Sequence, residues 1–170
     1  MMQRLLLRIL LLMIMMMGLI IESNPSSAIA ANIWDHQTTS NISTPQVTVY
    51  RSPSCSCCGN WLEHIQKQGL KIQADIKTDD MDTIKQKYNL PQELASCHTA
   101  IIDGYVMEGH IPADDIKRFL QQQPQLAGLA VPGMPIGSPG MELGNTQEPF
   151  NVMAFNHKGE VQVFKLAPLP

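Results

Sequence analysis

The sequence lacks two features that would point to a nucleic acid or a membrane as the protein's partner. It has 12 basic and 15 acidic residues, a net charge of −3, and so no basic excess of the kind that binds phosphate backbones. Its longest apolar run, residues 9–21, has 13 residues, whereas a membrane-spanning helix needs about 20. We therefore expect no nucleic-acid binding and no stable membrane span.

The first 30 residues have the pattern of a secretory signal peptide. Arg4 and Arg8 precede the apolar run, and the small-residue stretch Ala28-Ile29-Ala30 follows it. We predict cleavage after Ala30, with Ala28 as the second choice. A retained membrane anchor is the less favoured alternative, because no cationic flank follows the run. Cleavage would leave 140 residues, with an acidic excess, which suits one domain.

The chain also has few cysteines, four in all, yet three of them lie in the stretch SPSCSCCGNW, residues 52–61. In an oxidising compartment an even number of cysteines usually indicates a disulfide framework. However, a disulfide stabilises most when it closes a long loop, and pairs among Cys55, Cys57 and Cys58 close loops of only a few residues. A functional site is therefore favoured over structural disulfides, with redox and metal chemistry both open.

Hydrophobic periodicity predicts alternating strands and helices after a polar leader that ends at Pro45. Residues 47–50 and 71–77 are expected strands, and a helix with Trp61, Leu62 and Ile65 on one face lies between them and ends at Gly69. A short helix follows Asp79-Asp80 and is expected to bury Met81, Ile84 and Tyr88. Further expected elements are a hairpin around Asp103-Gly104, a helix after Pro112, and a second hairpin from residues 150–155 and 161–164.

This order of elements resembles the thioredoxin-like fold, and glutaredoxins most of all. Cys55 and Cys58 match the CxxC pair with which those proteins begin a helix, and Cys57 is an addition. The resembled fold places a cis-proline six residues before the hairpin glycine, where this chain has His98, preceded by Cys97. The resemblance implies a mixed α/β sheet flanked by helices, with Cys97 and His98 facing the cysteine loop.

The four cysteines Cys55, Cys57, Cys58 and Cys97 favour a soft metal ion. Thiolates select Cu(I), Zn(II) or iron–sulfur clusters, and a helix N-terminus favours the thiolate form. The adjacent Cys57 and Cys58 fit poorly around one tetrahedral zinc ion, whereas crowded thiolates can bridge several Cu(I) ions. We therefore favour Cu(I), held in a polynuclear thiolate cluster, over zinc.

Residues 128–144 form an apolar stretch with three prolines and five glycines and no helical or strand period. Such a long connection without secondary structure is typical of a functional loop. Met134 and Met141 are candidate thioether donors, although ordinary packing is favoured for both. For His98, a role at the metal and a mere replacement of the proline are equally weighted.

The other histidines are weaker candidates. His64 lies about 10 Å along the helix from Cys57, so a surface or core-edge position is favoured. His110, just before Pro112, is a possible neighbour of the site, but a role at the start of the helix is favoured. His36 and His157 are expected to be solvated.

Three motifs together resemble a family of periplasmic metal-binding proteins that includes the CopG-type copper-resistance proteins. They are SPSCSCCGNW, LASCHTAIIDGYVMEGHIP and GLAVPGMPIGSPGME, and the resemblance runs from about Val47 to Phe164. It implies a periplasmic thioredoxin-like domain that binds copper through Cys55, Cys57, Cys58 and Cys97. The expected layout is a signal peptide (1–30), a flexible leader (31–45), a core (46–122), and a loop and hairpin (123–170) packed on the same domain.

The leading functional hypothesis is a periplasmic copper-binding protein for copper resistance or homeostasis, which sequesters Cu(I) or couples it to thiol chemistry. Copper ions and other periplasmic copper-handling proteins are the expected partners. The alternative is a thiol–disulfide oxidoreductase with Cys55 as nucleophile and Cys58 as resolving thiol. The missing cis-proline argues against pure exchange. A third hypothesis is a binding domain that its disulfides merely stabilise.

Overall fold

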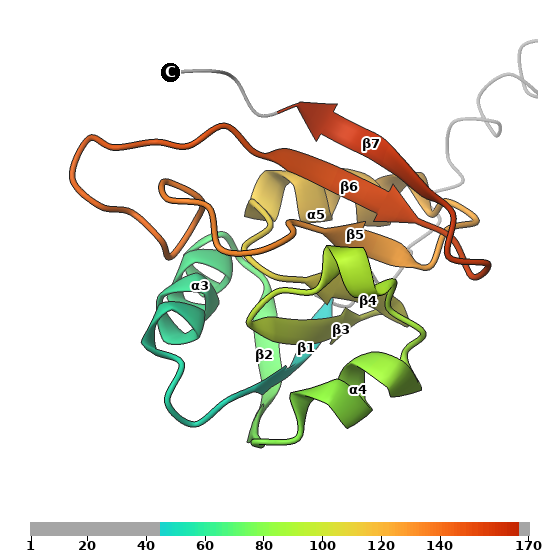
Figure 1. Ribbon diagram of the computed structural model, residues 1–170, viewed down its shortest axis with the longest axis horizontal. Coiled ribbons are helices and arrows are strands. Elements are labelled where there is room, and N and C mark those ends of the chain that lie inside the picture. Colours follow the sequence, from blue (N-terminus) through green and yellow to red (C-terminus); the bar gives the residue numbers. More distant parts are fainter. Residues whose placement is uncertain (1–44, 167–170) are drawn as a thin grey trace, which may run out of the picture. The chain divides into compact units, whose positions relative to one another are not determined.

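Strands from the whole length of the described chain form one mixed sheet in the computed structural model, which describes residues 45–166 (Figure 1). The strands are β1 (Gln46–Arg51), β2 (Lys71–Lys77), β3 (His98–Ile102), β4 (Tyr105–Glu108), β5 (Gly128–Ala130), β6 (Asn151–Phe155) and β7 (Val161–Leu166). The helices are α3 (Ser56–Lys67), α4 (Met81–Lys87) and α5 (Ala113–Gln122), with a short 3-10 helix η1 (Gln92–Leu94). The predicted signal peptide and nearly all of the predicted leader lie outside the described residues.

The strand order is β2-β1-β3-β4-β5-β6-β7. β1 is parallel to β2, and α3 connects them, as a parallel crossover requires. β3 is antiparallel to β1 and β4, β4 is parallel to β5, and β6 is antiparallel to β5 and β7. The predicted mixed α/β class is therefore confirmed, whereas the thioredoxin-like detail remains a prediction.

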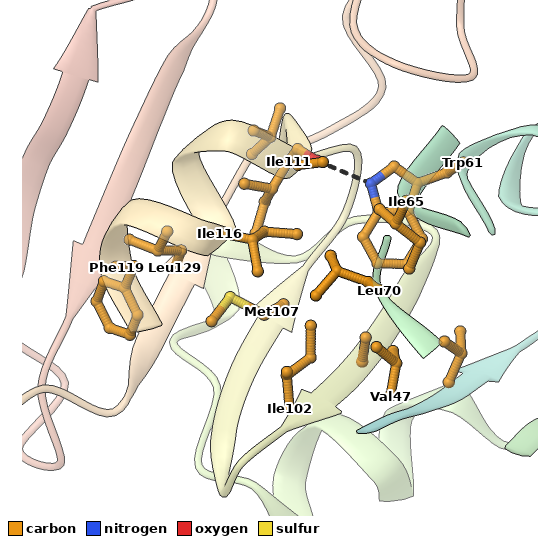
Figure 2. Close-up of a cluster of buried hydrophobic side chains, with 14 of the residues drawn as sticks. Val47, Trp61, Ile65, Leu70, Ile102, Met107, Ile111, Ile116, Phe119 and Leu129 are labelled. Atoms are coloured by element: carbon orange, nitrogen blue, oxygen red, sulfur yellow. Dashed lines mark hydrogen bonds between the residues drawn. The ribbon is translucent and has the colours of Figure 1, made fainter. Parts of the chain in front are cut away.

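The main hydrophobic core lies between the sheet and helices α3 and α5 (Figure 2). Side chains of β1 alternate between the two faces of the sheet, and that of Val47 points into the core. Trp61 and Ile65 project into it from the apolar face of α3. The indole N–H of Trp61 donates to the carbonyl oxygen of Ile111 at 2.9 Å, the bond drawn in Figure 2. This bond joins the first half of α3 to the segment that leads into α5.

Both predicted hairpins are present. Asp103 and Gly104, with φ of 49° and 86°, form the tight turn between β3 and β4, and positive φ at both positions is the geometry of a type I′ turn. β6 and β7 form the second hairpin. No helix within residues 45–166 combines the length and the apolar character that crossing a membrane would take.

Two local expectations were wrong. Residues 128–130 form strand β5 rather than part of a loop, and they show no alternation because all three are buried between β4 and β6. A side chain at Gly128 would also collide with the backbone of Val106. Helix α4 is present as expected, but Met81, Ile84 and Tyr88 are only partly buried.

Candidate metal centre

Three of the cysteines lie at the N-terminus of helix α3. Cys55 is the N-cap residue, and its Sγ accepts the backbone N–H of Cys58 at 3.3 Å. Arg51, paired with Asp75 at 2.7 Å, donates to the carbonyl oxygen of Cys55 at 3.1 Å and fixes the turn that precedes the helix. The free N–H groups and the positive end of the helix dipole favour thiolate at this position.

Cys55 and Cys58 form a disulfide, with their Cα atoms 5.4 Å apart. Cys57 and Cys97 are free thiols, and Cys57 Sγ lies 3.5 Å from Cys55 Sγ. Because disulfide sulfurs are not thiolates, the described state offers two thiols. Reduction of the Cys55–Cys58 disulfide, by two electrons and two protons, would give a state with four thiols.

Cys97 comes from a different part of the chain and completes the sulfur cluster. It directly precedes β3, where His98 pairs with Arg51 of β1, so it faces the loop that follows β1. Cys58 Sγ lies 3.9 Å from the carbonyl oxygen of Cys97. The Sγ atoms of all four cysteines lie within 4.8 Å of one another. The structure therefore brings together the four cysteines that the sequence singled out.

Two buried histidines approach the sulfur of Cys97. His98 Nδ1 lies 3.3 Å from it and His110 Nε2 lies 3.0 Å from it. The other ring nitrogen of His110 contacts the carbonyl oxygen of Pro139 at 2.8 Å. A carbonyl only accepts, so Nδ1 of His110 carries the hydrogen and Nε2 directs its lone pair at Cys97. Metal-binding histidines are held in this way, with the second nitrogen donating to a fixed acceptor.

Burial sets the protonation of these groups. It lowers the pKa of His98 well below 6.5, with a further contribution from the nearby charges of His110 and Lys85, and it also lowers the pKa of His110. Burial, together with the charge of Cys57, raises the pKa of Cys97 to about 12. At neutral pH Cys97 is therefore a thiol and both imidazoles are neutral, and neutral imidazole is the form that binds metals.

The sequence interpretation of His110 was wrong, since the structure places it in the site rather than in a role confined to the start of α5. The register of the β3–β4 hairpin would have predicted this position. Thr99 pairs with Glu108 across the β3–β4 hairpin, so the residues just outside that pair return to the same place. Counting outward from Asp103-Gly104 would have set His110 close to Cys97 and His98.

A buried carboxylate that the sequence analysis missed joins the two ligand-bearing segments. Glu108 is fully buried and accepts the N–H of Ser96 at 2.7 Å and the hydroxyl of Thr99 at 2.6 Å. It also forms an ion pair with Lys85 of α4. Burial raises the pKa of Glu108, and Lys85 opposes that shift. Residues 96–98 and 108–110 are thus held together just beside the sulfur cluster.

The loop that follows β5 covers the first turns of α3. Gly140 has φ of 86°, and a Cβ there would lie 2.7 Å from the backbone nitrogen of Trp61 and 2.9 Å from the carbonyl oxygen of Cys57. Asn60 donates to the Gly140 carbonyl at 3.4 Å. Met134 is 51% exposed and Met141 is partly buried. A thioether role for either methionine remains a prediction.

His64, predicted at the surface or the edge of the core, has a structural partner instead of a metal. It is partly buried, and its Nε2 accepts the backbone N–H of Ala113, the first residue of α5, at 3.2 Å. Because Pro112 provides no side-chain cap, His64 satisfies one of the unpaired N–H groups at the start of this helix. His157 is exposed, as expected.

The fold and the site define the class: an α/β protein with a mixed sheet flanked by helices and a cysteine cluster that could hold a metal ion. Comparison with known proteins identifies the family. Two solved structures of a copper resistance protein, copG, in form 2 and form 1, are 40% and 39% identical to this chain, with TM-scores of 0.69 and 0.68. Each match covers 73% of this chain and 98% of the other. The chain therefore belongs to the CopG family.

A family model described as "Protein of unknown function, DUF411" matches residues 94–141. This range contains Cys97, His98 and His110 but not Cys55, Cys57 or Cys58. A search of the curated proteins found no match.

Proposed function

We propose that this protein binds Cu(I) for copper resistance or homeostasis, through Cys55, Cys57, Cys58 and Cys97. The observation that carries the proposal is the gathering of four sulfurs within 4.8 Å of one another, from two distant parts of the chain. Binding through all four requires the Cys55–Cys58 disulfide to be reduced first. The family relationship to a copper resistance protein supports copper as the metal.

The donor set favours Cu(I) over Zn(II). A thiolate is a soft ligand, and Cu(I) accepts two or three sulfurs at low coordination number. Cys57 and Cys58 are adjacent on the first turn of α3, which hinders four-fold tetrahedral binding of one zinc ion but suits thiolates that each bridge two copper ions. His110, with its lone pair directed at Cys97, is a neutral donor for one copper ion of such a cluster.

We further propose that the protein acts in the periplasm after removal of residues 1–30, and that other periplasmic copper-handling proteins deliver or receive its copper. The proposal is supported by the signal-peptide pattern of the sequence and by the oxidised Cys55–Cys58 pair, which suits an oxidising compartment.

Metal titration of the mature chain, residues 31–170, tests the copper proposal. Reduced wild-type protein and Cys97→Ser are titrated with Cu(I) and Zn(II), with the bound metal counted by native mass spectrometry. We expect Cu(I) to remain bound to the wild type against a competing chelator, and Cys97→Ser to lose most of it. Ser54→Ala, an exposed change beside the cysteine loop, is the matched control. Tight binding of Zn(II) without Cu(I) would refute the proposal.

Thiol–disulfide exchange is a second candidate, favoured by the Cys55–Cys58 disulfide at the start of α3. Cys55 is the more accessible of the two, so it would attack a substrate disulfide, and buried Cys58 would then release the substrate thiol by forming the disulfide seen here. Against it, no peptide bond in the described part of the chain is cis. Insulin reduction distinguishes the candidates: exchange predicts activity that Cys97→Ser retains and Cys55→Ser loses.

A further inference from the structure

We infer that Tyr50 and Tyr88 form a site of oxidative modification, at which a one-electron oxidant joins the two rings in a dityrosine cross-link within one chain. The hydroxyl oxygens of the two side chains lie 3.4 Å apart, although the residues are 38 positions apart in the sequence. The ring centroids lie 6.1 Å apart, and the ring planes are tilted by 47°. The site includes none of the proposed copper ligands and goes beyond the proposed function.

Strand β1 and helix α4 bring the two tyrosines together. Val49 of β1 is completely buried in the main core, so Tyr50, the next residue, points to the opposite face of the sheet. Tyr88 directly follows α4 as its C-cap residue, and α4 packs against β1 and β3 (Figure 1). Both tyrosine side chains are partly buried, which holds the rings in place and still leaves them open to a small oxidant.

All three tyrosines of the chain lie in its described part, and only these two are placed for coupling. Tyr105 donates instead to the carbonyl oxygen of Pro124 at 3.2 Å, and its ring packs edge to face on Phe119. Neither of these neighbours has a phenol to couple with. The hydroxyls of Tyr50 and Tyr88 have each other as hydrogen-bond partners, so a radical formed on one ring has its coupling partner already beside it.

Coupling removes one hydrogen atom from each phenol. Each ring gives one electron to the oxidant and one proton to solvent, which leaves a neutral phenoxyl radical. A carbon–carbon bond then forms between ring carbons next to the hydroxyl-bearing carbons, and a proton moves from carbon to oxygen on each ring to restore its aromaticity. Two equivalents of a one-electron oxidant accept the two electrons, and the product is two hydrogen atoms lighter than the starting chain.

The pair lies on the strands that carry the candidate metal centre. Tyr50 directly precedes Arg51, which donates to the carbonyl oxygen of Cys55, and it pairs with Thr99 of β3, two residues after Cys97. Copper that cycles between Cu(I) and Cu(II) in the presence of peroxide is a source of one-electron oxidants. Only this source of the oxidant rests on the proposed function, since the geometry of the pair does not depend on copper.

The cross-link would attach α4 covalently to the sheet. No residue of α4 is fully buried, so its attachment depends on partly buried side chains and on the ion pair of Lys85 with Glu108. A bond between residues 38 positions apart also closes a loop in the unfolded chain and lowers its conformational entropy, as a disulfide does. Cross-linked protein should therefore unfold at a higher urea concentration than untreated protein.

Photo-oxidation of the purified, metal-free protein with a ruthenium–bipyridyl complex and persulfate tests the inference. The protein is kept dilute, with a chelator present, and is treated with a thiol reductant afterwards, so that neither copper nor disulfides contribute. We expect dityrosine fluorescence in the monomer and, after proteolysis, a cross-linked peptide pair that joins Tyr50 to Tyr88. This product survives reduction, whereas a disulfide, which also removes two hydrogen atoms, does not.

Phenylalanine variants locate the cross-link. Tyr50→Phe and Tyr88→Phe should each lose the fluorescence of the monomer, whereas Tyr105→Phe, the matched control, should keep it. Urea-unfolded wild type should lose the preference for this pair, because unfolding separates the rings.

Absence of the cross-link in folded wild type, its survival in Tyr50→Phe, or its loss in Tyr105→Phe would overturn the inference. Should a variant fail to fold, the peptide map of the wild type decides the matter. Cu(I) binding enters none of these measurements, so failure of the proposed function would leave the inference standing.

Discussion

The Nε2 atom of His110 lies 3.0 Å from the Sγ atom of Cys97, 13 residues earlier in the chain. The lone pair of this neutral imidazole points at the Cys97 thiol, because Nδ1 of His110 carries the hydrogen and donates it to the carbonyl oxygen of Pro139. It arises from the β3–β4 hairpin, which returns the chain to the level of Cys97 just before α5 begins.

Cys97 is expected to react slowly with alkylating reagents in the folded, metal-free protein. Burial and the charge of Cys57 raise its pKa to about 12, so very little of the reactive thiolate is present at neutral pH. Iodoacetamide labelling followed by peptide mass spectrometry should show slower modification of Cys97 in folded than in urea-unfolded protein. The rate should rise as the pH is raised. Equal rates in the two states would contradict the protonated thiol.

The ion pair of Lys85 and Glu108 is expected to stabilise the fold only as a pair. Lys85→Met leaves a fully buried carboxylate without its cation, and breaking a buried pair costs about 3–5 kcal/mol. The double variant Lys85→Met/Glu108→Gln should recover much of that loss, because no unpaired charge remains. Urea unfolding of the single and double variants gives the coupling free energy.

Lys87→Met, an exposed lysine on the same helix, is the control for the loss of a positive charge. If Lys85→Met and Lys87→Met had the same small effect on the free energy of unfolding, the Glu108 carboxylate would not need its partner.

A second measurement follows from the hydrogen bond between Glu108 and the backbone N–H of Ser96. Disturbing Glu108 should alter the alkylation rate of Cys97 even where the protein remains folded.

Local patterns in the sequence were enough to predict every strand except β5, the three α-helices and both hairpins, since alternation, helical spacing and the Asp103-Gly104 turn are properties of neighbouring residues. Strand β5 was missed because a three-residue strand buried on both faces has no alternation to detect. The four cysteines could be selected from spacing and from resemblance. His110 and Glu108 could not, because their importance depends on the register of β3 with β4.

The cap that His64 provides to α5 is expected to make stability depend on pH. Burial lowers the pKa of His64 below the 6.5 of an ordinary histidine. The neutral ring is the form whose Nε2 accepts the N–H of Ala113. The unfolded chain then binds the proton more readily than the folded one. The stabilisation is complete above pH 6.5 and is lost as the pH falls below it toward the lowered pKa.

Urea unfolding at about pH 7.5 and about pH 5.5 should therefore show a smaller loss of stability on acidification for His64→Gln than for the wild type. His64→Ala should also lose about 1 kcal/mol at the higher pH, the usual worth of a helix cap. His157→Gln, an exposed histidine, should behave like the wild type. An unchanged pH dependence in His64→Gln would show that the cap does not titrate in this range.

The contact of Gly140 with helix α3 is expected to hold the loop over the cysteines. Gly140→Ala would place a Cβ 2.7 Å from the Trp61 nitrogen and 2.9 Å from the Cys57 oxygen, both of them backbone atoms that cannot move aside. Gly144→Ala is a matched control, because Gly144 also has positive φ, 56°, but open space around it. Backbone strain of about 1–3 kcal/mol is common to both variants, and the clash adds to it only at Gly140. Urea unfolding should therefore show a larger loss for Gly140→Ala, and alkylation of Cys57 should become faster in that variant alone. Equal effects of the two changes would mean that the loop does not need its close approach to α3.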